Sequence, residues 1–167
     1  MTFIESNRDL LPALGRKIDL FRLTTTKSGS LARTEANIGL IIPMSILADQ
    51  QTVNLRKHLI NNFSINTIDA FPQKDDPARR VFPEAKLPTC VIIFKNSIQE
   101  YNSFLVVTHP GRYLNEISGR YRCYESILKM LDENYLPIPL LSSDFAADLV
   151  KKLHSSSERL CRIGNLI

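Results

Sequence analysis

The stretch that decides the fold is Ile38-Gly39-Leu40-Ile41-Ile42-Pro43, a short apolar run that ends at a proline. A continuous run of this length is typical of a strand buried on both faces of a parallel sheet. We therefore predict a central strand here. Ser45 follows as a candidate cap for an amphipathic helix over residues 46–61, in which apolar residues recur near helical spacing and Arg56 points away from the apolar face.

Further elements are predicted on both sides of this unit. β-branched content and flanking turn residues predict strands at residues 64–71, 89–95 and 104–108, with a proline-rich loop at residues 71–88. Residues 9–31 could form one helix or two, and we favour a covering helix with a frayed end, because threonines and a Ser-Gly-Ser segment weaken its continuation. Residues 121–131 and 143–154 predict two more helices, separated by Pro137 and Pro139.

This order of elements predicts an α/β fold. It matches the later half of a doubly wound sheet with an antiparallel ending, followed by a helical tail. We expect a partial α/β domain in residues 1–110 and the helical tail in residues 111–167, joined in one compact unit. A chain of 167 residues is long enough to bury a core without a disulfide or a metal.

Composition limits the classes of function. Lys and Arg exceed Asp and Glu by 21 − 17 = 4, and the sequence pI near 9.0 permits an acidic partner such as nucleic acid. No apolar run approaches the roughly 20 residues of a membrane helix, and the N-terminus lacks the pattern of a secretory signal. We expect a cytoplasmic protein without a membrane partner. The three cysteines are far apart and predicted to be free thiols, with Cys90 buried, and no metal-ligand spacing is present.

Motifs for nucleotide binding and covalent catalysis are absent from the sequence. It contains no G-x-G-x-x-G, no G-x-x-x-x-G-K-[ST] and no G-x-S-x-G. Asp75 and Asp76 could form a metal or acid-base couple, but in a proline-rich loop a solvated turn is the favoured interpretation.

Positive charge gathers in three clusters along the chain. They hold Lys74, Arg79, Arg80 and Lys86; Arg112, Arg120 and Arg122, with Tyr113 and Tyr121 interleaved; and Lys151, Lys152, Arg159 and Arg162. In the second cluster, arginines would reach phosphates while tyrosines stack on unpaired or flipped bases. The alternative is a solvated surface with the tyrosine rings packed inward. Lysines near the end of a helix, as in the third cluster, are expected for dipole reasons alone. The candidate DNA-binding residues are Arg79, Arg80, Arg112, Arg120 and Arg122.

Several segments in order resemble adenine-specific DNA methyltransferases of restriction-modification systems. They are Asp19-Leu20-Phe21, Ile41-Ile42-Pro43-Met44-Ser45, Leu55-Arg56-Lys57-His58-Leu59, Val81-Phe82 and Thr89-Cys90-Val91-Ile92-Ile93. In that family a D-L-[YF] helix, a strand ending I-[VI]-P-x-S, a helix with L-R-K-x-L, a variable loop with V-F and a T-C-[VI]-[IL]-[IL] strand follow the catalytic loop. The match covers about residues 17–96, and residues 136–167 resemble the approach to the family's target-recognition region.

The resemblance implies a Rossmann-like methyltransferase sheet, DNA as the substrate and S-adenosylmethionine as the methyl donor of the complete enzyme. The family's F-x-G-x-G cofactor loop and N-P-P-[YF] catalytic loop are absent from these 167 residues. We therefore assign no catalytic and no cofactor-binding residue, and expect the chain to be inactive alone and to bind no cofactor. This looks like the C-terminal part of a catalytic domain, whether a gene remnant, an excised domain or a piece of a split enzyme.

A second chain would then supply the cofactor-binding half. A sheet without its first strands would also expose an edge that needs a partner strand. Two other hypotheses stay open: a non-enzymatic DNA-binding or subunit-interface module of a restriction-modification system, and a small α/β domain unrelated to methylation.

Overall fold

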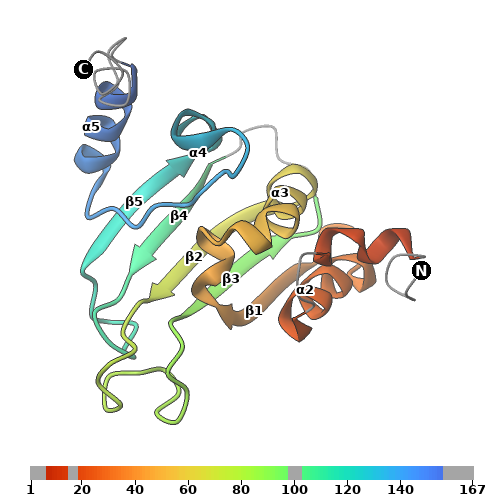
Figure 1. Ribbon diagram of the computed structural model, residues 1–167, viewed down its shortest axis with the longest axis horizontal. Helices are drawn as coiled ribbons and strands as arrows, with labels where there is room; N and C mark the ends of the chain where they lie inside the picture. The colour runs from red at the N-terminus through yellow and green to blue at the C-terminus, as the bar shows by residue number, and fades with distance from the viewer. Residues whose placement is uncertain (1–6, 15–18, 98–102, 156–167) are drawn as a thin grey trace, which may run out of the picture.

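The computed structural model describes residues 7–14, 19–97 and 103–155, in which five strands form one mixed sheet (Figure 1). The strands are β1 (Asn37–Pro43), β2 (Ser64–Phe71), β3 (Thr89–Lys95), β4 (Ser103–Thr108) and β5 (Gly119–Tyr124). They lie in the order β1-β3-β2-β4-β5. Strand β3 is antiparallel to both neighbours, β2 and β4 are parallel, and β5 is antiparallel to β4. The α/β class and the antiparallel ending are confirmed.

Helices pack on one face of this sheet. They are α2 (Leu20–Leu31), α3 (Val53–Asn62) and α4 (Glu125–Asp132), with α5 (Asp144–Ser155) beside β5 and 3-10 turns at η1 (Arg8–Ala13), η2 (Met44–Leu47) and η3 (Gln50–Thr52). The core lies where Cys90, Ile92 and Phe94 of β3 meet Leu55 and Leu59 of α3. In the view of Figure 1, α3 lies over the strands.

Strand β1 is the decisive apolar run, but it lies at an edge and not at the centre of the sheet. Among the described residues it pairs with β3 alone. Its burial alternates, and the side chain of Ile41 is 58% exposed. The prediction of a strand is confirmed and that of a central, doubly buried strand is wrong, because an apolar run does not specify what pairs with its second edge.

The helix predicted over residues 46–61 is shorter than expected. Two 3-10 turns precede it, and α3 begins at Val53. The backbone carbonyl of Ser45, and not its side chain, accepts the N–H of Asp49 at 2.9 Å. The side chain of Asp49 instead accepts the N–H of Gln51 at 2.8 Å. An Asx turn at Asp49 therefore delays the helix.

Arg56 is buried, contrary to the polar face predicted for it. Its guanidinium donates to the carbonyl oxygens of Ile46 at 2.8 Å and Leu136 at 2.9 Å, and to the hydroxyl of Thr52 at 3.0 Å. Burial lowers the pKa of Arg56 to about 10, and the nearby Asp49 opposes that shift. The side chain joins η2, α3 and the segment after α4. Helical periodicity alone predicted a solvated arginine at this position, and that prediction is wrong.

The segment predicted as a covering helix holds the 3-10 turn η1 and helix α2, which begins at Leu20. The predicted frayed end is wrong, because α2 continues through the threonines and the Ser-Gly-Ser segment to Leu31. The hydroxyls of Thr24, Thr25 and Thr26 each donate to the carbonyl four residues earlier. Gly29 lets the helix approach Phe63 closely, because an added Cβ would lie 2.5 Å from the ring. The low helix propensity of these residues is offset by packing.

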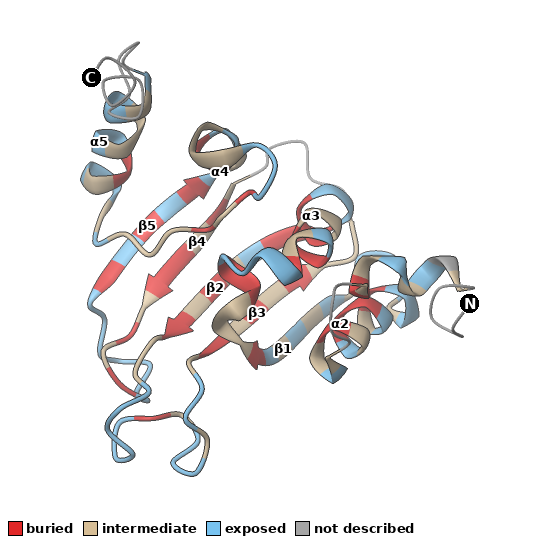
Figure 2. Ribbon diagram, viewed as in Figure 1, coloured by how far each residue is buried: buried red, intermediate tan, exposed pale blue. Residues whose placement is uncertain are grey.

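The helix predicted at residues 121–131 begins only at Glu125. Residues 119–124 form β5, so the sheet continues into the segment predicted to be a helical tail. The alternation of buried and exposed residues along β5 is visible in Figure 2. The prediction failed because a six-residue alternation was read together with the amphipathic helix that follows it.

The other predicted elements are confirmed. Strands at residues 64–71, 89–95 and 104–108, the loop before residue 89, and helix α5 lie where they were expected, with both prolines between α4 and α5. Cys90 and Cys123 are buried free thiols, and Cys161 lies outside the described residues. In the described part of the chain, no helix has both the length and the apolarity that crossing a bilayer requires.

Candidate nucleic-acid interface

Strand β5 presents Arg120, Arg122 and Tyr124 on one exposed face, while Tyr121 and Cys123 enter the core. The two arginines are two residues apart, which places them roughly 7 Å from each other along the strand. The register pairs Arg120 with Val107 and Arg122 with Leu105 of β4. Side chains paired in this way share one face, so the arginine stems can cover this apolar surface while their charges face solvent.

The outer edge of β5 is held by the segment that leads into α5. The N–H of Arg120 donates to the carbonyl of Ser142 at 3.2 Å, and the N–H of Arg122 donates to the carboxylate of Asp144 at 2.7 Å. On α5, the Lys151 ammonium lies 5.2 Å from the centroid of the Tyr124 ring. The backbone of β5 is thus fixed while its arginine side chains stay exposed.

The two arginines of the 72–88 loop have different surroundings. Arg80 is buried and donates to the carbonyls of Lys74 at 2.6 Å, Pro83 at 2.7 Å and Asp75 at 3.2 Å. Arg79 is exposed and donates to the carbonyl of Pro110 at 2.7 Å. In this conformation Arg80 shapes its own loop, whereas Arg79 joins the loop to the 109–118 loop.

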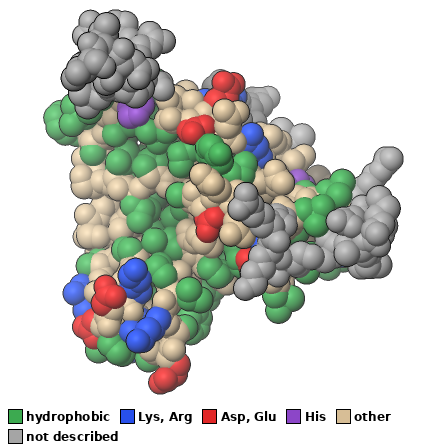
Figure 3. Space-filling view, viewed as in Figure 1, with side chains coloured by type: hydrophobic (Ala, Val, Ile, Leu, Met, Phe, Trp, Pro, Cys, Tyr) green, Lys and Arg blue, Asp and Glu red, His purple; other side chains and the backbone are tan. Residues whose placement is uncertain are grey.

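The 109–118 loop carries Arg112 and is fixed at its base. The His109 ring is buried, lies 2.9 Å from Asp69 and 2.8 Å from the carbonyl of Glu116, and stacks on Phe71. Arg112 is exposed, with its guanidinium carbon 5.1 Å from the centroid of the Tyr113 ring. In Figure 3, basic, acidic and hydrophobic side chains gather at the end of the molecule that these two loops form.

The structure therefore brings the exposed Arg79 and Arg112 together at one end of the sheet, close to where β5 begins. Arg120 and Arg122 follow along β5. The two tyrosines of this cluster differ: Tyr113 is 52% exposed, whereas Tyr121 is buried and donates its hydroxyl to the carbonyl of Pro139 at 2.6 Å.

The described residues hold no group of three or more His, Cys, Asp or Glu side chains that could bind a metal ion. Asp76 accepts the N–H of Ala78 at 2.9 Å, as in the solvated turn that the sequence favoured. Burial raises the pKa of Cys90 to about 12 and that of Cys123 to about 11, so neither thiol is a reactive thiolate.

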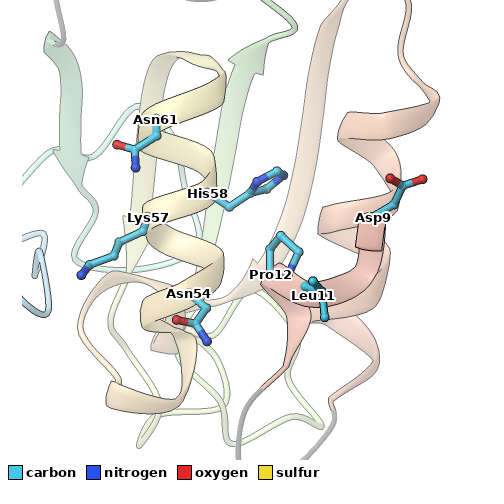
Figure 4. Close-up of a pocket in the computed structure, with 7 residues that line it drawn as sticks. All are labelled: Asp9, Leu11, Pro12, Asn54, Lys57, His58 and Asn61. Carbon is cyan, nitrogen blue, oxygen red and sulfur yellow. The ribbon is translucent and has the colours of Figure 1, made fainter. Parts of the chain in front are cut away.

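An open groove of about 540 Å³ lies between η1 and α3, away from the arginines (Figure 4). It is lined by Asp9, Leu11, Pro12, Asn54, Lys57, His58 and Asn61. In Figure 4 His58 points toward η1, while Lys57 and Asn61 point away from it. Burial lowers the pKa of His58, which keeps the ring neutral at pH 7. Because the polar groups diverge, we place the candidate site on the arginine surface and not in this groove.

Sequence reasoning missed Tyr124 and the Asp69–His109 pair that anchors the loop, and it assigned Lys151, which lies over the Tyr124 ring, to a separate basic cluster. The alternation of arginine and core residues in residues 119–124 is a signal that would have found the exposed face of β5. No comparable signal links Asp69 to His109, because the two residues meet only through the parallel pairing of β2 and β4.

No protein-family model matches the sequence, and no curated protein matches it. Solved structures do match the fold. The M protein of the type I restriction enzyme EcoKI matches 93% of this chain, with a TM-score of 0.56 and 12% identity, over 50% of its own length. The methyltransferase subunit of a type I restriction-modification system from Streptococcus thermophilus matches 96%, with a TM-score of 0.50 and 15% identity, over 29% of its length. This chain thus spans half or less of these proteins, and it shares the fold of the part that it matches.

Proposed function

We propose that this chain is a part of an adenine-specific DNA methyltransferase of a restriction-modification system, supplying later strands of the catalytic sheet and a DNA-facing surface. The observation that carries the proposal is the fold likeness to the two methyltransferase subunits, which extends over nearly the whole chain. The matched fold is a sheet in which β3 lies antiparallel between β1 and β2. The ordered sequence resemblance gives independent support.

Methyl transfer to the exocyclic amine of adenine requires a donor and a flipped base held in line. S-adenosylmethionine supplies the methyl group in the complete enzyme. The described connections at the carboxyl ends of β1, β2 and β4 do not fit this cofactor: their one glycine, Gly111, packs against Arg79, and no glycine-rich cradle is present. We therefore propose that these residues bind no cofactor and that the chain is inactive alone.

The DNA-facing surface consists of the exposed Arg79, Arg112, Arg120 and Arg122, with Arg80 as the residue that shapes the first loop. Ligands of open α/β sheets bind beyond the carboxyl ends of parallel strands, where the 72–88 and 109–118 loops lie. Exposed arginines on a fixed backbone suit contacts to phosphates, which position a protein on DNA.

A second chain that completes the sheet is the proposed protein partner. The N–H of Met44 donates to Pro88 and that of Asn96 to Ala36, so even-numbered residues of β1 face β3. The backbone groups of Asn37, Gly39 and Ile41 therefore point toward the outer edge, where β1 pairs with no other strand among the described residues. A strand of the second chain would pair with these groups.

The test is duplex DNA binding by the purified chain at low and moderate salt, with S-adenosylmethionine binding measured on the same sample by calorimetry. We expect salt-sensitive DNA binding and no cofactor binding. Binding of S-adenosylmethionine with micromolar affinity would contradict the proposal that this chain lacks the site for the methyl donor. If the chain bound neither DNA nor S-adenosylmethionine, the DNA-facing role would be refuted. DNA binding without methyltransferase activity, even when a cofactor-binding chain is added, would favour the non-enzymatic module. The unpaired outer edge of β1 is also compatible with a subunit interface of such a module.

A further inference from the structure

Three large apolar side chains lie on the outer surface of the loop between β4 and β5. Tyr113 is 52%, Leu114 66% and Ile117 53% exposed. The N–H of Glu116 donates to the carbonyl of Tyr113 at 3.3 Å, which makes a tight turn with Leu114 and Asn115 at its apex. Asn is a usual residue at such a position, whereas Leu is not. Three neighbouring exposed apolar side chains here mark an interaction surface.

This apolar turn is held in place before any partner arrives. At its start, His109 is buried, donates its backbone N–H to the carbonyl of Ala70 at 2.9 Å and bonds through its ring to Asp69. At its end, Ser118 donates its N–H to the carbonyl of Thr108 at 2.8 Å. A loop fixed at both ends loses little conformational entropy on binding.

The positive charge around the turn favours a negatively charged partner. Residues 109–124 contain three arginines and a single carboxylate, that of Glu116. Arg112 directly precedes the turn and lies over the Tyr113 ring, while Arg120 and Arg122 follow it on β5. Apolar side chains flanked by arginines are the combination with which proteins insert between base steps while gripping the phosphates on either side.

We propose that the turn at residues 113–117 is a DNA wedge, in which Leu114 enters the base stack between phosphates held by Arg112 and Arg120. This inference rests on the proposed DNA-facing function and adds to it a means of opening the stack. Unstacking costs free energy that is recovered when the apolar side chain is buried and the arginines reach phosphates on both sides.

The test compares Leu114→Ala with Leu87→Ala in the full chain, each checked for folding by thermal unfolding. Leu87 is a matched control, because it is 60% exposed on the neighbouring 72–88 loop. The probe is a duplex carrying 2-aminopurine, whose fluorescence rises when it is unstacked. We expect the parent and Leu87→Ala to raise the fluorescence. Leu114→Ala should not raise it and should bind intact duplex roughly tenfold more weakly. The salt dependence of DNA binding by Leu114→Ala should equal that of the parent, because the substitution removes no charge.

The outcomes separate the wedge from the function on which it rests. No DNA binding by the parent chain would overturn both. Salt-sensitive binding in which Leu114→Ala matches Leu87→Ala, with no fluorescence increase for any variant, would overturn the wedge alone. Capture of a protein by the parent that Leu114→Ala abolishes, with DNA binding unaffected, would also overturn the wedge and make the turn a protein-docking surface.

Discussion

The His109 ring lies 2.9 Å from the Asp69 carboxylate, across two parallel strands and 40 residues of sequence. Its other ring nitrogen lies 2.8 Å from the carbonyl oxygen of Glu116. The ring also stacks on Phe71, with 4.6 Å between centroids. One side chain therefore joins β2, β4 and the far side of the 109–118 loop.

His109→Phe should keep the stacking on Phe71 and remove both polar contacts. Losing these two part-buried contacts should cost about 2 kcal/mol of the free energy of unfolding. Urea unfolding measures the loss, and hydrogen exchange should show faster opening in residues 109–118. His58→Phe serves as the control, since the half-buried His58 ring contacts the edge of Phe63 and its hydrogen-bond partner Asn62 is exposed. Equal effects of the two substitutions would argue against the anchoring role.

Arg56→Met should destabilise the protein by about 3 kcal/mol, because the carbonyls of Ile46, Tyr135 and Leu136 lose a shared buried donor. The matched control is Arg33→Met, at an exposed arginine, for which we expect a change within about 0.5 kcal/mol. Chemical denaturation of both variants checks the difference. A stable Arg56→Met protein would mean that the apolar side chain repacks the site.

Two strand glycines provide a matched pair. A Cβ at Gly119 would lie 2.7 Å from the carbonyl oxygen of Leu141, a backbone atom that cannot rotate away, whereas Gly39 has open space. Gly119→Ala should therefore cost about 1–3 kcal/mol, and Gly39→Ala should be neutral. Thermal unfolding distinguishes them. If Gly119→Ala proved neutral, the contact between β5 and the segment before α5 would have to be looser than described.

Stability should fall at alkaline pH. Burial raises the pKa of Cys90 to about 12 and that of Cys123 to about 11, from 9.0 for a free thiol. Burial also raises the pKa of Tyr121. A raised folded-state pKa gives a contribution that is complete below about pH 9 and is lost as the pH rises toward 11–12. Urea midpoints on either side of pH 9 measure the loss. Cys90→Ala should show a smaller alkaline decline, and an unchanged decline would exclude Cys90 as its source.

Arg122→Ala should weaken DNA binding uniformly across sequences. Removing one phosphate contact lowers the slope of log affinity against log salt by about one. Fluorescence anisotropy at several salt concentrations measures the slope. Arg33→Ala removes the same charge from an exposed position outside the DNA-facing surface and should leave the slope nearly unchanged. Equal changes in both variants would indicate that only net charge matters.

The strands could be predicted from sequence because each has a local signature, and those at residues 64–71 and 89–95 were placed to the residue. What failed depended on contacts distant in sequence. The edge position of β1 is decided by what pairs with it, and the burial of Arg56 by carbonyls 80 residues away. Residues 119–124 had a local signature as well, but the strong amphipathic pattern of α4 obscured it.

At the candidate site, the sequence suggested which arginines to consider but not how they are arranged. Arg79 and Arg80 are neighbours with the same charge, yet one is exposed and the other is bonded to three carbonyls of its own loop. Composition cannot separate them, because the difference arises from the path of the backbone around Arg80.

The position of β3 between β1 and β2 also constrains how the chain folds as it is synthesised. Ile42 and Ala70 both pair with Cys90, and the two earlier strands do not pair with each other. Contacts of such separation form slowly, and unpaired apolar strands are prone to aggregate. A nascent chain that has not yet emerged as far as residue 89 holds two strands without their common neighbour. The yield of folded protein should therefore depend on chaperones that shield β1 and β2 until β3 leaves the ribosome.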